Sequence, residues 1–166
     1  MTQRGGVAVA GGRDRARRMV TINFGASILL LVQYLLGMAA NLYVTIPAHH
    51  PGANAANYLG GVVSGVTWVI PHGPGWLAAH AALGVALVLA AFGSLAVALR
   101  LRRRAYTVTS LIGALAILGA GFNGASFLNY GQQFSSMIMA GLWALALGSY
   151  VTGLFVAARR PEALPR

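Results

Sequence analysis

Four long stretches of this chain contain no charged residue. They run from about residue 20 to 46, 75 to 99, 107 to 128 and 134 to 158. About 20 apolar residues in a helix cross the hydrocarbon core of a bilayer, and backbone groups in lipid must bond within their own segment. Each stretch is therefore predicted to be a spanning helix, and the predicted fold class is an all-α integral membrane four-helix bundle.

The composition excludes several soluble classes of protein. Of the 166 residues, 57% are hydrophobic and only 8% are charged, whereas a soluble domain carries about 25% charged residues. This excludes an ordinary soluble enzyme and, despite a net charge of +10, a nucleic-acid-binding domain. The chain has no cysteine, which excludes disulfides, thiolate metal sites and thiol redox chemistry.

The basic residues predict the orientation in the membrane. All 12 are arginines, and they lie within residues 4–18, 100–104 and 159–166. Four spans place these clusters on one side, which the positive-inside rule assigns to the cytoplasm. We expect a multi-pass protein of the cell (plasma) membrane with cytoplasmic N- and C-termini. Residues 1–19 and 159–166 are its basic tails, and the Gly- and Arg-rich first tail is expected to be disordered.

The segment 48–74 is ambiguous. Its apolar part, residues 53–70, could form a fifth span, but it contains three glycines and is bounded by Pro51 and Pro71. A fifth span would also place the arginines of 100–104 opposite the N-terminal cluster, against the positive-inside rule. We therefore expect a long outer loop between the first and second spans, with a short helix at the membrane surface.

His80 is the only histidine within a predicted span, about one turn inside the outer end of the second. No Asp, Glu, Lys or Arg lies in any span, which disfavours proton-coupled exporters, ion pumps and voltage sensors. Neutral imidazole is the commonest metal ligand. The alternative is a histidine that bonds to a neighbouring helix, because a buried polar group without a partner costs free energy.

Several residues at about the same depth in the membrane as His80 are compatible with a heme pocket. Gly84 follows on the same helix face, and Met137 and Met139 lie at a similar depth in the fourth span, with Gly141 four residues after Met137. Histidine and methionine are a known pair of heme ligands, and glycines leave room for the ring. Alternatively, the methionines fill the core and the glycines allow close helix packing.

The position of His80 gives the chain a resemblance to one half of a heme A synthase, or to a small four-helix b-type membrane cytochrome. In these families, histidines near the outer starts of the second and fourth helices bind heme inside the bundle. The resemblance implies heme b in the outer half of the bundle, with His80 as a ligand. The fourth span of this chain differs from the family pattern because it has no histidine.

Three further histidines, His49, His50 and His72, lie in the predicted outer loop. They are candidate ligands for copper or zinc. Alternatively, they are solvated side chains or outer-face proton sensors.

Polar residues also recur within the first and third spans. Gln33, Gly37 and Asn41 are spaced four residues apart in the first, and Asn123 and Ser126 lie near the outer end of the third. They predict a polar seam between helices or, alternatively, the lining of a site for a ligand or a quinone headgroup.

Three functional hypotheses follow. The first is an accessory or structural subunit without enzymatic activity, which packs in the lipid bilayer against a larger membrane complex or another copy of itself. The second is a heme-binding electron-transfer or heme-handling protein. The third is a small-molecule channel or carrier without a charged coupling site in the membrane. An absorption spectrum separates the second hypothesis from the others.

Overall fold

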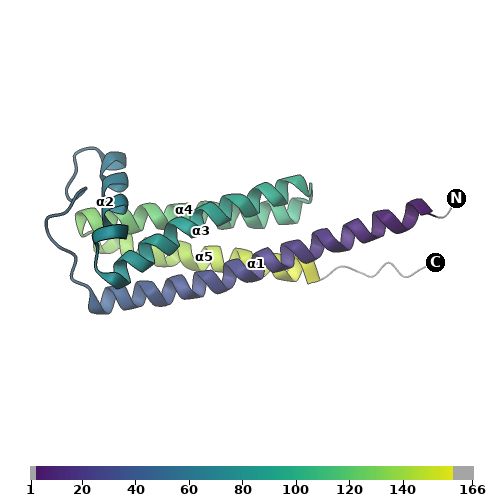
Figure 1. Ribbon diagram of the computed structural model, residues 1–166, viewed down its shortest axis with the longest axis horizontal. Helices are drawn as coiled ribbons and strands as arrows, with labels where there is room; N and C mark the ends of the chain where they lie inside the picture. The colour runs from purple at the N-terminus through teal and green to yellow at the C-terminus, as the bar shows by residue number, and fades with distance from the viewer. Residues whose placement is uncertain (1–2, 159–166) are drawn as a thin grey trace.

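The computed structural model describes residues 3–158, with side chains from residue 17 onward, and this part of the chain contains helices and no strands (Figure 1). The helices are α1 (Gln3–Tyr43), α2 (Tyr58–His72), α3 (Gly75–Arg100), α4 (Arg104–Tyr130) and α5 (Gln133–Ala158). Four segments are long and apolar enough to cross a membrane: Arg17–Tyr43 of α1, and the whole of α3, α4 and α5. The predicted all-helical protein with four such helices is confirmed.

The four long helices form an elongated bundle (Figure 1). Helix α1 packs against α3 and α5, and α4 packs against the same two helices. The order around the bundle is therefore α1, α3, α4, α5, with α3 and α5 diagonally opposite. We call the end that carries the α3–α4 turn (Leu101–Arg103) the arginine end, and the end that carries α2 the cap end.

Helix α1 differs from the expectation at its start. The sequence predicts disorder for residues 1–19, but the helix begins at Gln3. Residues 3–19 contain three alanines and five arginines, which are good helix formers, and no proline, against four glycines, which are poor ones. Extending an existing helix also avoids the cost of nucleation, so this segment continues the helix of the span.

Helix α2 occupies the ambiguous segment and lies across the cap end of the bundle (Figure 1). The side chain of Asn57 caps its start by accepting a hydrogen bond from the Gly60 N–H (2.9 Å). The buried residues of α2 are Gly61, Gly65 and Val69, and the helix packs against α3 and α4. Gly65 permits this close approach, because a β-carbon there would overlap the side-chain amide of Asn129.

Alanine is the commonest buried residue at the centre of the bundle. Its buried cluster consists of Leu30, Leu87, Ala91, Ala114, Ala116, Ile117, Ala146 and Tyr150. A second buried cluster lies at the arginine end and consists of Met19, Ala98, Tyr106 and Ala157. Small side chains let helix backbones approach closely, which strengthens van der Waals packing where lipid provides no hydrophobic driving force.

Candidate functional site

His80 is bound to helix α1 through a single residue, Gln33. Its Nδ1 lies 3.1 Å from the Gln33 main-chain oxygen, so Nδ1 carries the proton and donates it to that carbonyl. The side-chain amide of Gln33 donates in return to the His80 main-chain oxygen (3.0 Å) and lies 3.4 Å from Nε2 of the ring. Both ring nitrogens therefore face Gln33, and the neutral Nδ1–H tautomer satisfies all these contacts.

Two glycines make this contact possible, one on each helix. A β-carbon at Gly37 would lie 2.9 Å from Cε1 of His80, and one at Gly84 would lie 3.2 Å from the amide nitrogen of Gln33. The two polar side chains thus fill the space beside both glycines. Gly84 was a candidate for leaving room beside a heme, but here it accommodates Gln33.

The candidate methionines lie apart from His80. They belong to α5, which is diagonally opposite α3 in the bundle. The side chain of Met137 is 62% exposed, and Met139 faces α4, where its sulfur would lie 3.2 Å from a β-carbon at Gly124. Gly141 is exposed, with nothing within 4 Å of a β-carbon built there. The structure therefore joins His80 to α1 and does not bring it to the methionines.

Helix α1 is also tied to α5 at nearly the same level. The indole N–H of Trp143 donates to the main-chain oxygen of Leu30 (2.8 Å). The Trp143 ring stacks on Tyr34, with ring centroids 4.7 Å apart. One short stretch of α1 thus holds both neighbouring helices, α3 through Gln33 and α5 through Leu30 and Tyr34.

The loop histidines lie in separate surroundings. His50 stacks on Trp68, and its ring nitrogens lie 3.0 Å from the Pro51 oxygen and 3.2 Å from the Leu128 oxygen. His72 lies 3.3 Å from the Trp68 oxygen, and His49 is exposed. No group of three or more His, Cys, Asp or Glu residues that could hold a metal ion occurs among the described residues.

The end of α4 binds the segment that precedes α2. The last carbonyls of a helix have no partner within it. Here the Leu128 oxygen faces the His50 ring, and the Asn129 oxygen accepts from the Asn54 N–H (3.0 Å). The Phe127 oxygen accepts from the N–H of Gly131, whose φ of 62° suits glycine. The carbonyls at the end of α4 thus receive donors from the chain before α2 and from their own C-cap.

Side chains complete the connection between α4 and the cap. The Tyr58 hydroxyl lies 2.8 Å from Oγ of Ser126 and 3.2 Å from the Phe122 oxygen, and the Tyr130 hydroxyl donates to the Ala55 oxygen (3.0 Å). Asn123 instead bonds within its own helix, to the Gly119 oxygen (2.9 Å). Asn41, the last residue of the predicted seam, is exposed. Of the four polar residues of the predicted seam, Gln33 and Ser126 bond to another element.

A further set of polar side chains was not anticipated from the sequence. The atoms Asn23 Nδ2, Ser94 Oγ, Ser110 Oγ and Tyr150 OH are buried without a hydrogen-bond partner among the described residues. They come from the four long apolar helices, one from each, towards the arginine end. Asn23 stands beside Gly153, where a β-carbon would overlap its amide. Single Asn, Ser and Tyr residues in apolar runs are common, so no sequence signal marked this set.

Comparison with protein-family models, curated proteins and solved structures finds no match for this chain. Its function is therefore inferred from the geometry above. The sequence contains no Asp or Glu between residues 17 and 158. Within the described part of the chain, the polar side chains of the cap-end half mainly join one helix to another or to the cap. That arrangement can hold a bundle together.

Proposed function

We propose that this protein is an accessory or structural subunit of the membrane, which works by packing against a larger membrane complex or another copy of itself. The contact between His80 and Gln33 carries the proposal. The most reactive side chain in the spans has both ring nitrogens facing a residue of the neighbouring helix. Its use is therefore to fix α3 against α1, and the spans contain no carboxylate for proton-coupled transport.

The rest of the polar framework supports the same role. Tyr58, Tyr130 and Asn54 hold the cap on α4, and Trp143 holds α5 on α1. These bonds define a bundle with a fixed cap, which is a suitable scaffold for a partner. The apolar surface of the spans then faces lipid and the partner together.

The orientation belongs to the proposal as well. Both termini lie in the cytoplasm and the cap lies outside, because this arrangement places all 12 arginines on the cytoplasmic side of the cell membrane. A cysteine introduced at Ala55 should react with a membrane-impermeant reagent added from outside. Labelling only after the cytoplasmic face is opened would contradict this orientation.

Native mass spectrometry of the full chain, extracted from its own membrane in a mild detergent, tests the accessory role. The proposal predicts a defined assembly of fixed stoichiometry, either a homo-oligomer or a complex with another membrane protein. Its mass should include no heme. A monomer at every detergent and protein concentration would contradict the accessory role.

One observation favours the heme alternative enough to keep it as a second candidate. A histidine that binds a metal usually donates its other ring N–H to a carbonyl or carboxylate, which fixes the tautomer. His80 makes such a bond to the Gln33 main-chain oxygen, leaving Nε2 as the acceptor nitrogen. Heme would bind there only if the Gln33 amide moved away, so Gln33→Ala should strengthen heme retention if this candidate is correct.

A further inference from the structure

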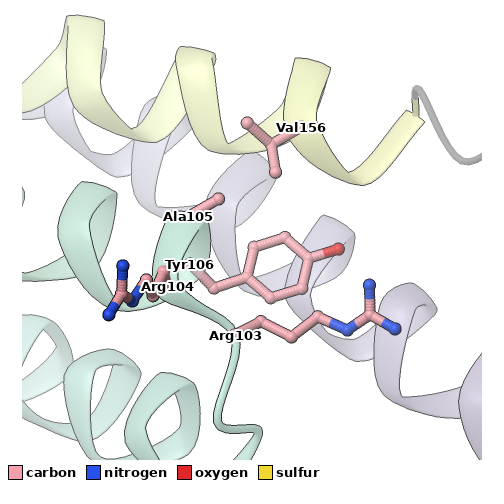
Figure 2. A pocket seen from close by; sticks show the side chains of 5 residues that line it. All are labelled: Arg103, Arg104, Ala105, Tyr106 and Val156. Carbon is pink, nitrogen blue, oxygen red and sulfur yellow. The ribbon is translucent and has the colours of Figure 1, made fainter.

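A cavity of about 290 Å³ lies at the arginine end, between the start of α4 and the end of α5 (Figure 2). Its lining residues are Arg103, Arg104, Ala105, Tyr106 and Val156. In Figure 2 the Arg103 side chain runs along the Tyr106 ring, so that the guanidinium and the hydroxyl extend in the same direction. Ala105 and Val156 add an apolar wall.

The electrostatics of this cavity favour an anion. Two arginines line it, and the two acidic residues of the chain, Asp14 and Glu162, lie outside residues 17–158. Helix α4 begins at Arg104, and its N-cap residue Arg103 makes no side-chain capping bond. The first N–H groups of a helix carry a partial positive charge and have no partner within the helix, so they add to the attraction for an anion.

Tyr106 also lines the cavity, and its side chain is only 2% exposed. Its main-chain oxygen accepts a bond from Thr109 (3.3 Å). Its hydroxyl extends in the same direction as the Arg103 guanidinium (Figure 2), so a ligand in the cavity can accept hydrogen bonds from both groups.

We propose that this cavity binds a phosphate group, and that an anionic phospholipid headgroup carries it. The guanidinium of Arg103 and the hydroxyl of Tyr106 donate to the phosphate oxygens, and Arg104, whose side chain extends in the opposite direction (Figure 2), adds positive charge nearby. Guanidinium suits phosphate because its planar donors match the oxygens. A lipid is the preferred carrier because the cavity lies where two spans end and has an apolar wall, and basic pockets between spanning helices bind lipid headgroups.

The test uses the full-length protein in detergent and titrates phosphatidylglycerol or phosphatidylcholine while native mass spectrometry counts bound lipid. Arg103→Gln with Arg104→Gln removes two charges from the cavity. The matched control, Arg100→Gln with Arg102→Gln, removes two charges from the same end, outside the lining. The melting temperature of each variant without added lipid shows whether it has folded.

The wild type should bind phosphatidylglycerol in preference to phosphatidylcholine. The cavity double variant should bind it about thirtyfold more weakly, because each basic residue near a membrane surface contributes about a fivefold gain in affinity for anionic lipid. The control should remain within about threefold of the wild type, since screening weakens charges outside the site. Equal losses in both double variants would overturn the proposal, because the attraction would then be diffuse.

Two further experiments test the contact with the Tyr106 hydroxyl and the identity of the molecule that carries the phosphate. Tyr106→Phe keeps the ring and removes the hydroxyl, and it should weaken phosphatidylglycerol binding about tenfold, as expected for a hydrogen bond to a charged group. Wild-type affinity in this variant would contradict the site. Inorganic phosphate alone should not reproduce the rise in melting temperature that phosphatidylglycerol gives. An equal rise with inorganic phosphate would overturn the assignment to a lipid.

Discussion

Gln33 of α1 and His80 of α3 bond to each other in both directions. The histidine ring donates to the main-chain oxygen of the glutamine (3.1 Å), and the glutamine amide donates to the main-chain oxygen of the histidine (3.0 Å). Each residue thus binds the backbone of the other helix, which fixes both the distance and the register of the two helices. Interhelical bonds of this kind stabilise membrane bundles by about 0.6 kcal/mol on average.

Each of the two side chains should therefore contribute to stability by itself. Gln33→Ala and His80→Ala should each cost about 1 kcal/mol, measured by unfolding in denaturing detergent, because each variant loses a bond to the backbone of the other helix. The two losses should be nearly additive, because each alanine variant keeps the main-chain oxygen to which the other side chain bonds. Met137 is 62% exposed on α5, so Met137→Ala should change stability little and serves as the control. No loss in either Gln33→Ala or His80→Ala would mean that the contact contributes nothing to stability.

Replacing Gly37 or Gly141 by alanine should have opposite effects on stability, because the two glycines differ in what lies beside them. Gly37→Ala should destabilise the protein by about 1–3 kcal/mol, because the new β-carbon would lie 2.9 Å from the His80 ring. Gly141→Ala meets nothing within 4 Å and should stabilise the protein by up to about 1 kcal/mol through helix propensity. Thermal unfolding of the purified variants measures both. Equal effects at the two positions would refute the close contact at Gly37.

The cap should loosen when Tyr58 loses its hydroxyl. Tyr58→Phe removes the bonds to Ser126 and to the Phe122 oxygen, so amide hydrogens of residues 52–61 should exchange faster. Tyr43 is 74% exposed, so Tyr43→Phe should leave exchange in this segment unchanged. The measurement is hydrogen exchange read by mass spectrometry. Unchanged protection in Tyr58→Phe would show that the apolar contacts of α2 alone hold the cap.

Two aromatic residues of α5 should respond in opposite ways. Trp143→Phe loses the bond to the Leu30 oxygen and should cost about 1 kcal/mol or more, measured by unfolding in denaturing detergent. The Tyr150 hydroxyl is buried without a partner among the described residues, so Tyr150→Phe should be neutral or stabilising. A cost above about 1 kcal/mol for Tyr150→Phe would instead indicate an internal water bonded to that hydroxyl.

The sequence predicted the four long apolar helices because length, hydropathy and absence of charge determine them directly. The second predicted span, 75–99, coincides with α3 to within one residue at its end, Gly75–Arg100. The start of α1 differs from the expectation of disorder, because composition cannot tell a disordered Gly- and Arg-rich tail from the extension of an existing helix.

The candidate site was harder to predict because it depends on which helices are neighbours. His80 and the methionines were linked by depth, which the sequence gives. The direction in which each side chain points depends on packing, and α3 lies diagonally opposite α5. The true partner of His80 lies 47 residues earlier, on α1. The spacing of four residues between Gln33 and Gly37 indicated a seam in the sequence. The sequence did not indicate that His80 of α3 would contact this seam.

An absorption spectrum tests the central claim most directly, namely that His80 joins two helices and binds no cofactor. Wild-type protein should be purified from cells supplied with heme, beside His80→Ala as the matched variant. We expect a colourless wild type with no Soret band, and a His80→Ala variant that differs only by a lower melting temperature. A Soret band in the wild type that His80→Ala removes would contradict the claim and establish His80 as a heme ligand.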